Sequence, residues 1–319
     1  MVQRLLTTSI AEVRVFSRDE KKQFDMRKQF AASPQVTFMI GDVRDAAQLD
    51  RACSGIDMVF HAAALKQVPS CELFPGEALK TNLIGAQNLI GAAIANNVER
   101  VVAVSTDKAV KPVNVMGMTK AIQERLIINA NQLSHNQKTR FCCVRYGNVM
   151  NSRGSVLPLF RRLLRDGKPL TVTHPEMTRF MLTFGDAIDL VIYALVHMRG
   201  GELFVKKAPA AYMVDVAAVF AEMHGAPAQP ISFIGQFAGE KLHEILLSDE
   251  ELIRSKDCGD YFVVAPWSMP PHSESLGGVN KEYGSRDNIV GREVLRGLLE
   301  RSDREVRTMQ YEDSYFVVS

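Results

Sequence analysis

Short apolar runs rich in β-branched residues alternate along this chain with longer segments of helical periodicity. The apolar runs lie at 12–17, 36–42, 57–63, 100–105 and 140–148. Segment 77–97, between the third and fourth runs, repeats apolar residues at helical spacing. Because the strands of a parallel sheet are buried on both faces, this alternation predicts an α/β fold with a doubly wound parallel sheet covered by helices.

The pattern loosens after Asn151, where helical periodicity remains at 185–198 and 213–225 between segments that contain Pro and Gly. A chain of 319 residues is long enough for a large domain with a smaller appended lobe. We predict a first domain at 1–151, a smaller lobe at 152–267 that shares segments with it, and a C-terminal tail at 268–319 that is irregular before a last helix near 291–300.

Charge and composition narrow the classes of function. The 38 Lys and Arg residues nearly balance the 36 Asp and Glu residues, so no nucleic-acid partner is expected. The five cysteines lack metal-ligand spacing, which indicates reduced, packed thiols. No apolar stretch approaches the length of a membrane span. We therefore expect a cytoplasmic protein with no membrane contact and no metal site.

The beginning of the chain lacks a feature that a dinucleotide-binding fold requires. Such a fold opens with a strand and a glycine-rich turn, G-x-x-G-x-x-G, whose backbone amides hold a pyrophosphate. Here the first apolar run has the features of the second strand, and residues 1–11 resemble the end of the preceding helix. We expect the first strand and its turn to be missing, and an extension of roughly 20–25 residues to strengthen cofactor binding.

The densest group of reactive side chains lies at 105–121, where "STDKA" ends a predicted strand and M-x-x-x-K begins the next helix. Open α/β sheets bind ligands at the carboxyl ends of their strands, so Thr106, Asp107 and Lys108 should face a pocket. Met116 and Lys120 are one helical turn apart and share a face. A capped helix start with solvated charges is the alternative, but three titratable groups beside a cofactor seat favour catalysis.

Residues that follow other apolar runs predict where a dinucleotide would rest. Arg18 suits the extra phosphate of NADP, whereas an acidic residue there would suit NAD. Each group could instead be a solvated charge or a packing alanine, and His61 at a strand end is interpreted as structural. The candidate cofactor residues are Ser17, Arg18, Asp42, Val43, Ala62, Ala63 and Ala64.

Eight blocks in order carry a family resemblance: "SRDEKKQ", "GDVRD", "HAAALKQVP", "KTNLIGAQN", "STDKA", "RYGNVMNSRGSVLPLF", "MTRFMLT" and "GEKLHE". Together they resemble the inverting UDP-N-acetylglucosamine 4,6-dehydratases. These are extended short-chain dehydrogenase-like enzymes of bacterial surface-polysaccharide biosynthesis, which supplies capsule and lipopolysaccharide. The resemblance runs from about Glu12 to Tyr261. One branch of the family carries methionine at the position of Met116, where tyrosine is usual.

The resemblance implies an NADP-dependent reaction on UDP-N-acetylglucosamine that yields a 4-keto-6-deoxy-L-arabino sugar. Hydride leaves carbon 4, the carbon 5 proton is abstracted, water leaves carbon 6, and the hydride returns to carbon 6. Lys108 would be the base at carbon 5, and Asp107 the acid that protonates the departing hydroxyl. Thr106 would hydrogen-bond oxygen 4, and Lys120 would hold the nicotinamide ribose.

Met116 cannot accept the proton of the carbon 4 hydroxyl, because a thioether is only a weak acceptor. Lys120, Lys66 or a bound water could take it, and the sequence leaves these three open. Met116 itself would shape the pocket wall or exclude a misplaced water.

The same resemblance extends the binding sites. Arg179 suits a pyrophosphate, whereas Phe237 stands where the family usually has an arginine. We also expect a homo-oligomer. The further cofactor contacts are Lys66, Asn82, Lys120, Tyr146 and Asn148, and the substrate contacts are Lys66, Asn148, Thr171, Arg179 and Glu240.

Two other functions compete with the dehydratase. A UDP-sugar 4-epimerase would keep the carbon 6 hydroxyl, and Asp107 and Lys108 argue against it because epimerisation at carbon 4 needs no such pair. An inactive fragment or binding subunit is suggested by the absent glycine-rich turn. Whether the protein binds NADP at all separates this last possibility from the dehydratase.

Overall fold

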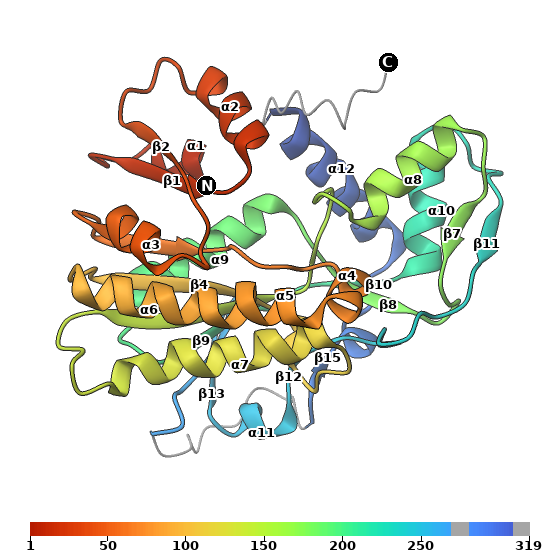
Figure 1. Ribbon diagram of the computed structural model, residues 1–319. Coiled ribbons are helices and arrows are strands. Elements are labelled where there is room, and N and C mark those ends of the chain that lie inside the picture. The colour runs from red at the N-terminus through yellow and green to blue at the C-terminus, as the bar shows by residue number, and fades with distance from the viewer. Residues whose placement is uncertain (269–280, 309–319) are drawn as a thin grey trace.

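The computed structural model describes residues 1–268 and 281–308, and its largest element is a six-stranded sheet (Figure 1). The strand order is β13-β14-β9-β5-β4-β3, and the four strands from β9 to β3 are parallel. β14 and β13 extend the sheet in antiparallel pairing. The strands are β3 (Met58–His61), β4 (Arg100–Thr106), β5 (Arg140–Tyr146), β9 (Leu203–Lys206), β13 (Ser255–Cys258) and β14 (Tyr261–Val264).

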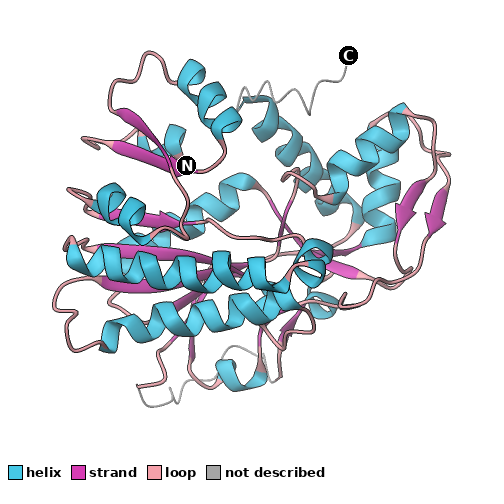
Figure 2. Ribbon diagram, viewed as in Figure 1, coloured by secondary structure: helices cyan, strands magenta, loops and turns pink. Residues whose placement is uncertain are grey.

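Helices cover both faces of this sheet, as Figure 2 shows. Alternate residues of β4 and β5 pack to opposite sides: Val101 and Cys143 join one core cluster, and Val102 and Cys142 join another. The first cluster contains residues of α6 (Gly85–Ala95) and α7 (Val115–Asn129), and the second contains residues of α9 (Phe184–His197). The predicted doubly wound α/β fold is therefore confirmed.

A separate parallel pair, β1 (Val13–Ser17) and β2 (Val36–Ile40), lies apart from the six-stranded sheet (Figure 1). Helices α2 (Glu20–Gln29) and α3 (Ala46–Cys53) follow these strands. Among the described residues, no strand pairs with the second edge of β1 or of β3. The short helix α1 (Val2–Leu5) precedes β1.

The predicted helix at 77–97 is interrupted in the structure. It consists of α5 (Pro75–Leu79), a π-helical turn η1 (Lys80–Ile84) and α6. Asn82 in this turn is fully buried and exchanges hydrogen bonds with both backbone groups of Leu65, and it donates to Thr119. The turn thus fixes the loop after β3, which leads into α4 (Val68–Leu73).

A second hydrophobic core lies beyond the sheet, on the right of Figure 1. It is built around Phe160, Phe220 and Leu295, from three helices. A three-stranded sheet, β10-β8-β6, and the parallel pair β7–β11 adjoin it. The elements are β6 (Asn148–Val149), α8 (Val156–Arg165), β7 (Leu170–Val172), β8 (Thr178–Leu182), β10 (Ala210–Tyr212), α10 (Met213–Met223), β11 (Ile231–Phe233) and α12 (Arg292–Thr308).

The described part of the C-terminal segment, 281–308, contains more regular structure than the sequence predicts. β15 (Tyr283–Gly284) pairs with β12 (Ile245–Leu247), and the 3-10 turn η4 (Ser285–Asn288) follows it. The predicted last helix is present as α12, which continues to Thr308 and packs on α10 through Leu295 and Leu299. Part of the expected tail, at 269–280 and 309–319, lies outside the described residues.

A buried ion cluster ties the main sheet to the C-terminal elements. Arg145 on β5 is 1% exposed, and its guanidinium group donates from one edge to Glu124 of α7 and from another edge to Glu251 of α11 (Asp249–Leu252). Because a buried charge must be paired, this cluster fixes α7 and the segment around β12 relative to β5. Those elements carry the candidate site.

Candidate functional site

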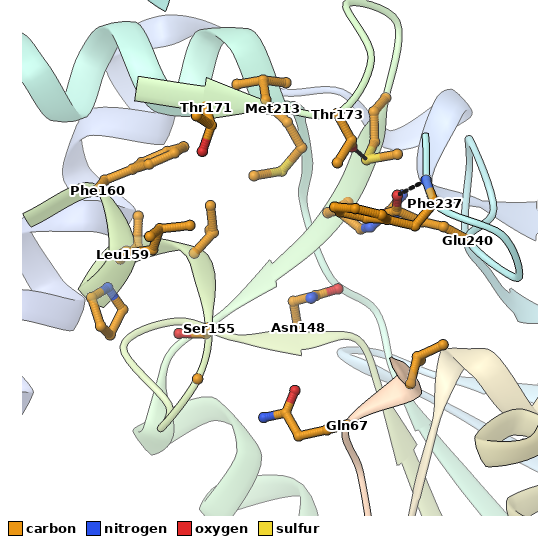
Figure 3. Close-up of a pocket in the computed structure, with 18 of the residues that line it drawn as sticks. Gln67, Asn148, Ser155, Leu159, Phe160, Thr171, Thr173, Met213, Phe237 and Glu240 are labelled. Carbon is orange, nitrogen blue, oxygen red and sulfur yellow. Dashed lines mark hydrogen bonds and ion pairs between the residues drawn. The ribbon is translucent and has the colours of Figure 1, made fainter. Parts of the chain in front are cut away.

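A cavity of about 1110 Å³ lies between the carboxyl end of the main sheet and the second core. In Figure 3, Thr171 and Met213 lie across this cavity from Gln67, with Phe237 and Glu240 to one side. Of the predicted residues, Lys108, Asn148, Thr171, Arg179 and Glu240 line it.

The predicted catalytic residues meet where β4 ends. Register pairs Thr106 with Tyr146 of β5, and the 3-10 turn η2 (Asp107–Ala109) begins at the next residue. Thr106 donates from Oγ1 to Asp107 Oδ1 at 2.9 Å, and Lys108 Nζ donates to the same oxygen at 3.0 Å. Of these three predicted pocket residues, Lys108 lines the cavity, whereas Thr106 and the fully buried Asp107 are not part of its lining.

Two glycines allow the backbone to close around this group. A Cβ on Gly117 would lie 2.2 Å from the Lys108 carbonyl oxygen, so α7 can pack against η2 only with glycine there. A Cβ on Gly147 would lie 2.4 Å from Phe180 Cβ and 3.4 Å from Asp107 Oδ2. Both sites hold Lys108 at the cavity lining and the fully buried Asp107 beside it.

Glu244 completes the cluster, although the sequence predicts no role for it. Its Oε1 lies 2.9 Å from Lys108 Nζ, and its Oε2 lies 3.7 Å from Lys241 Nζ. Glu244 is 1% exposed and also lines the cavity. It belongs to the "GEKLHE" block, in which Glu240 is the predicted substrate contact; the pairing of Glu244 with Lys108 depends on the fold.

The pKa values of the Asp107 and Glu244 carboxyl groups are shifted in opposite directions. Burial raises the pKa of Asp107, and Lys108 offsets this only in part. Burial acts in the same direction on Glu244, but the charges of Lys108, Arg179 and Lys241 outweigh it and lower its pKa. Burial would lower the pKa of Lys108, but Asp107 and Glu244 raise it. The cluster therefore holds an ammonium group between a protonatable acid and a carboxylate.

Lys120 occupies a different environment. It is 6% exposed, and its Nζ donates to the Val104 carbonyl oxygen at 2.6 Å and to the side-chain oxygen of Gln123. Gln123 Nε2 lies 3.0 Å from His61 Nε2. Burial lowers the pKa of Lys120 to about 8 and that of His61 to about 3. His61 is thus a buried, hydrogen-bonded residue, in keeping with its structural interpretation.

Met116 does not line the cavity. It is 4% exposed and belongs to a small apolar cluster with Cys71 and Ala78, packed by Leu65 and Val68. The Met116 thioether therefore packs in an apolar cluster beside the predicted site.

Arg179 lies beside the cavity with its guanidinium group partly engaged. It donates to the carbonyl oxygens of Thr178 and Leu242 and to Glu240 Oε1 at 3.0 Å. Phe237, at the position where an arginine was expected, is 59% exposed and also lines the cavity. This wall thus presents one cation and one aromatic ring to a ligand.

Most of the predicted dinucleotide residues lie outside the cavity lining, whereas Asn148 is part of it. Arg18 Nη1 is 3.6 Å from Asp42 Oδ2, so an acidic group stands near the predicted phosphate site after all. Val43 is buried against Gly85, and Asn82 holds the Leu65 loop, so neither side chain faces an open surface. Ala62, Ala63 and Lys66 are exposed, and Ala64 is half-buried.

Cations gather beside that loop. Although the Lys66 residue is exposed, its ammonium is partly desolvated, and this and the nearby charges of Lys22 and Arg153 lower its pKa. Three cations near one another suit an anionic ligand such as a pyrophosphate, whose binding would relieve their repulsion. Tyr146, whose pKa burial raises to about 12, ends β5, and Lys120 contacts the neighbouring strand β4 at Val104. The chemistry of these side chains fits a dinucleotide.

Within residues 1–268 and 281–308, no group of three His, Cys, Asp or Glu side chains could hold a metal ion. None of the helices described there is both long and apolar enough to cross a membrane. Four of the five cysteines are buried and Cys258 is half-buried, all as free thiols.

Comparisons with known proteins give the chain a family context. A family model described as "Polysaccharide biosynthesis protein" matches residues 1–266. A protein of Rickettsia canadensis named UDP-glucose 4-epimerase is 49% identical over 257 residues, which cover 81% of this chain and 75% of that protein. Its namesake in Rickettsia prowazekii is 48% identical with the same coverage.

Solved structures are similar as well. The X-ray structure of Pen from Bacillus thuringiensis has a TM-score of 0.87 at 37% identity, covering 94% of this chain and 93% of that chain. The dTDP-glucose 4,6-dehydratase DesIV of Streptomyces venezuelae, with NAD and TYD bound, has a TM-score of 0.69 at 22% identity. The match covers 76% of this chain and 82% of the DesIV chain. The likeness shows that the two share a Rossmann-like fold.

Proposed function

The chain belongs to the family of polysaccharide biosynthesis proteins, and from this premise we propose that it is a nicotinamide-dependent 4,6-dehydratase acting on UDP-N-acetylglucosamine. The product would be a UDP-4-keto-6-deoxy-L-arabino sugar for a bacterial surface polysaccharide. The observation that carries the proposal is the cluster of Asp107, Lys108 and Glu244 at the cavity, because elimination of water needs both an acid and a base.

The residues of the cluster have separate tasks in this reaction. A bound nicotinamide supplies the acceptance of the carbon 4 hydride and its return to carbon 6. Lys108 takes the carbon 5 proton as a free amine, and Asp107, whose pKa is raised, donates a proton to the departing carbon 6 hydroxyl. Thr106 orients oxygen 4 through its hydroxyl. Because Asp107 is buried, it stays protonated closer to neutral pH than an ordinary aspartate.

The proton of the carbon 4 hydroxyl requires an acceptor other than Met116. Lys120 is the best candidate of the three, because its pKa of about 8 leaves part of it as a free amine at neutral pH. Its position on α7, one turn after Met116, is also the position from which it would hold the nicotinamide ribose.

We expect the cofactor to be NADP. Ser17 and Arg18 would bind the phosphate on the adenosine ribose, and the cations Lys22, Lys66 and Arg153 would face the pyrophosphate. A charge-assisted hydrogen bond contributes about 1.5–3 kcal/mol, so NADP+ should bind roughly 10- to 100-fold more tightly than NAD+. Fluorescence titration with both cofactors measures this preference. Equal affinities would show that Arg18, with Asp42 3.6 Å away, does not select the phosphate.

A UDP-sugar 4-epimerase is the second candidate, and the names of the Rickettsia relatives favour it. An epimerase removes and returns the hydride at carbon 4 and keeps the carbon 6 hydroxyl. The polar cluster at the cavity would then have no proton transfers to perform at carbons 5 and 6.

Mass spectrometry of the product distinguishes the two. The protein is incubated with NADP+ and, in separate reactions, with UDP-N-acetylglucosamine and UDP-glucose. Dehydration lowers the product mass by one water, whereas epimerisation leaves the mass unchanged and alters chromatographic retention. An epimer of unchanged mass would replace the dehydratase proposal. Cofactor binding without turnover of either sugar would indicate a binding subunit.

A further inference from the structure

Glu244 is a buried carboxylate whose place is fixed by the C-terminal elements. It immediately precedes β12, and its backbone N–H donates to Ser285 Oγ at 2.9 Å. Ser285 Oγ in turn lies 2.6 Å from Thr178 Oγ1 on β8. Its 1% exposure and this anchoring leave the carboxylate little freedom to move away from Lys108.

Charged groups face Glu244 from each element packed around it. Asp107 and Lys108 come from η2, Arg179 from β8, and Lys241 from the segment that Glu244 itself belongs to. Oε1 accepts the Lys108 ammonium, but Oε2 is buried and has no hydrogen-bond partner among the described residues. Asp107 Oδ2 is buried and unpartnered in the same way.

These contacts leave Lys108 between two carboxyl groups at nearly equal distance, 3.0 Å to Asp107 and 2.9 Å to Glu244. Only Glu244 is surrounded by additional cations, so the negative charge of the cluster resides there. An ammonium group beside a buried carboxylate holds its proton tightly. Lys108 must lose that proton before its lone pair can act as a base.

We propose that Glu244 is a positioning residue for Lys108, which it holds at the cavity edge and whose conversion from ammonium to free amine it controls. In that conversion an N–H bond breaks, the proton passes to water and the electron pair stays on nitrogen. The inference rests on the proposed function for the role of Lys108 as the base, but its test requires no sugar substrate.

Competitive acetylation of the full chain at a series of pH values measures the amine directly. A trace of acetic anhydride labels each lysine in proportion to its free-amine fraction, and peptide mass spectrometry reports each site separately. In Glu244→Gln, the pH of half-maximal labelling at Lys108 should fall by about 1–3 units, because a stabilising opposite charge is gone. Glu282→Gln is the matched control, since it removes the carboxylate that pairs with the exposed Lys111. In the control, labelling at Lys108 should not move.

Failure to fold is handled by a second pair of variants. If Glu244→Gln is unfolded by circular dichroism, then Lys108→Met combined with Glu244→Gln should fold and melt at a higher temperature than either single variant, because neither the Lys108 ammonium nor the Glu244 carboxylate is then left without the other. An absence of this rescue would overturn the proposal. So would an unmoved labelling midpoint at Lys108 in a folded Glu244→Gln.

The proposed function fails independently of this inference. If the wild-type protein does not dehydrate the sugar, the labelling midpoint of Lys108 should still shift in Glu244→Gln. If the wild-type protein does dehydrate the sugar but the midpoint is the same in Glu244→Gln, only the role of Glu244 is refuted. A Glu244→Gln protein that loses dehydration without a labelling shift would make Glu244 merely structural, and that result also overturns the proposal.

Discussion

Lys108 and Lys120 lie close together in the sequence and flank the start of the same helix, but their surroundings give them opposite properties. Lys108 lies between two carboxyl groups, which outweigh burial and raise its pKa. Lys120 donates to a backbone carbonyl and to the neutral side chain of Gln123, and burial outweighs the nearby charge of Glu124 and lowers its pKa to about 8. Burial alone therefore does not decide the charge of a lysine; the charge of its partners does.

This difference suits two proton transfers at neighbouring sugar carbons. An amine that is partly neutral near pH 8 can accept a hydroxyl proton when the hydride leaves carbon 4. Lys108, an ammonium group paired with Asp107 and Glu244, keeps its charge until its surroundings change. It therefore suits a proton transfer later in the reaction. The pairing of one lysine with acids and the other with amides thus fits an ordered reaction, oxidation before elimination.

The largest effect is expected from Lys108→Ala, which removes the lysine that is paired with acids. Loss of a general base lowers the rate of its step by about 10²–10⁴-fold. Solvent deuterium should therefore enter carbon 5 at least that much more slowly, while reduced cofactor accumulates because oxidation at carbon 4 precedes this step. Absorbance of the reduced nicotinamide and mass spectrometry of the sugar measure the two quantities.

Lys111→Ala is the control for this change, because Lys111 is exposed and pairs with Glu282 and Asp249 at the surface. Rapid deuterium incorporation by Lys108→Ala would place the carbon 5 base elsewhere. Glu244 would then be the first residue to test.

The next effect is a pH dependence of stability at Lys120. Its pKa is about 8 when folded against an ordinary value of 10.5, so between these values the unfolded chain binds more protons. Unfolding free energy must therefore rise with pH in this window, by about 3 kcal/mol in total. Relative to Lys120→Met, the wild-type protein should gain that amount between pH 7 and pH 10.5, as measured by urea unfolding.

Lys138→Met serves as the matched control, because Lys138 is exposed. A constant difference between wild type and Lys120→Met across this window would mean that Lys120 stays charged when folded. The contrast with Lys108 would then disappear.

The sequence predicted the sheet and its helices well because their signals are local. The strands at 13–17 and 100–106 and the helix at 184–197 lie within a residue or two of the predicted runs, since apolar periodicity reflects burial directly. The adjacency of Thr106, Asp107 and Lys108 also followed from chain order. These features need no knowledge of distant segments.

Other features depend on tertiary contacts and could not be predicted in that way. Glu244 reaches Lys108 only because β12 pairs with β15 and Ser285 anchors its backbone. The π-turn around Asn82 arises from hydrogen bonds to Leu65 and Thr119. Asp42 lies beside Arg18 because the strands that precede these two residues pair in the sheet, and apolar periodicity does not predict which strands pair.

A smaller effect is expected from Gln123→Leu, which removes the amide that hydrogen-bonds Lys120. The amide joins Lys120 to His61, and its loss leaves His61 Nε2 buried without this partner. An unsatisfied buried group costs about 2 kcal/mol of stability. Urea unfolding at pH 7 measures the loss, with the exposed Gln132→Leu as control. Equal losses in the two variants would show that the amide adds nothing to the folded state.

The smallest effect is expected from Met116→Tyr, which restores the phenol that related enzymes place one turn before the lysine. Met116 is packed among Cys71, Ala78 and Leu65, so a tyrosine ring would overfill this cluster and cost about 1 kcal/mol of stability. We expect no gain in the rate of carbon 4 oxidation, because Lys120 already supplies a neutral amine. Single-turnover measurement of cofactor reduction tests this, with Met118→Tyr on the exposed face of α7 as control. A tenfold faster oxidation in Met116→Tyr alone would show that the wild-type site lacks an effective proton acceptor, and Lys120 would then serve only to bind the cofactor.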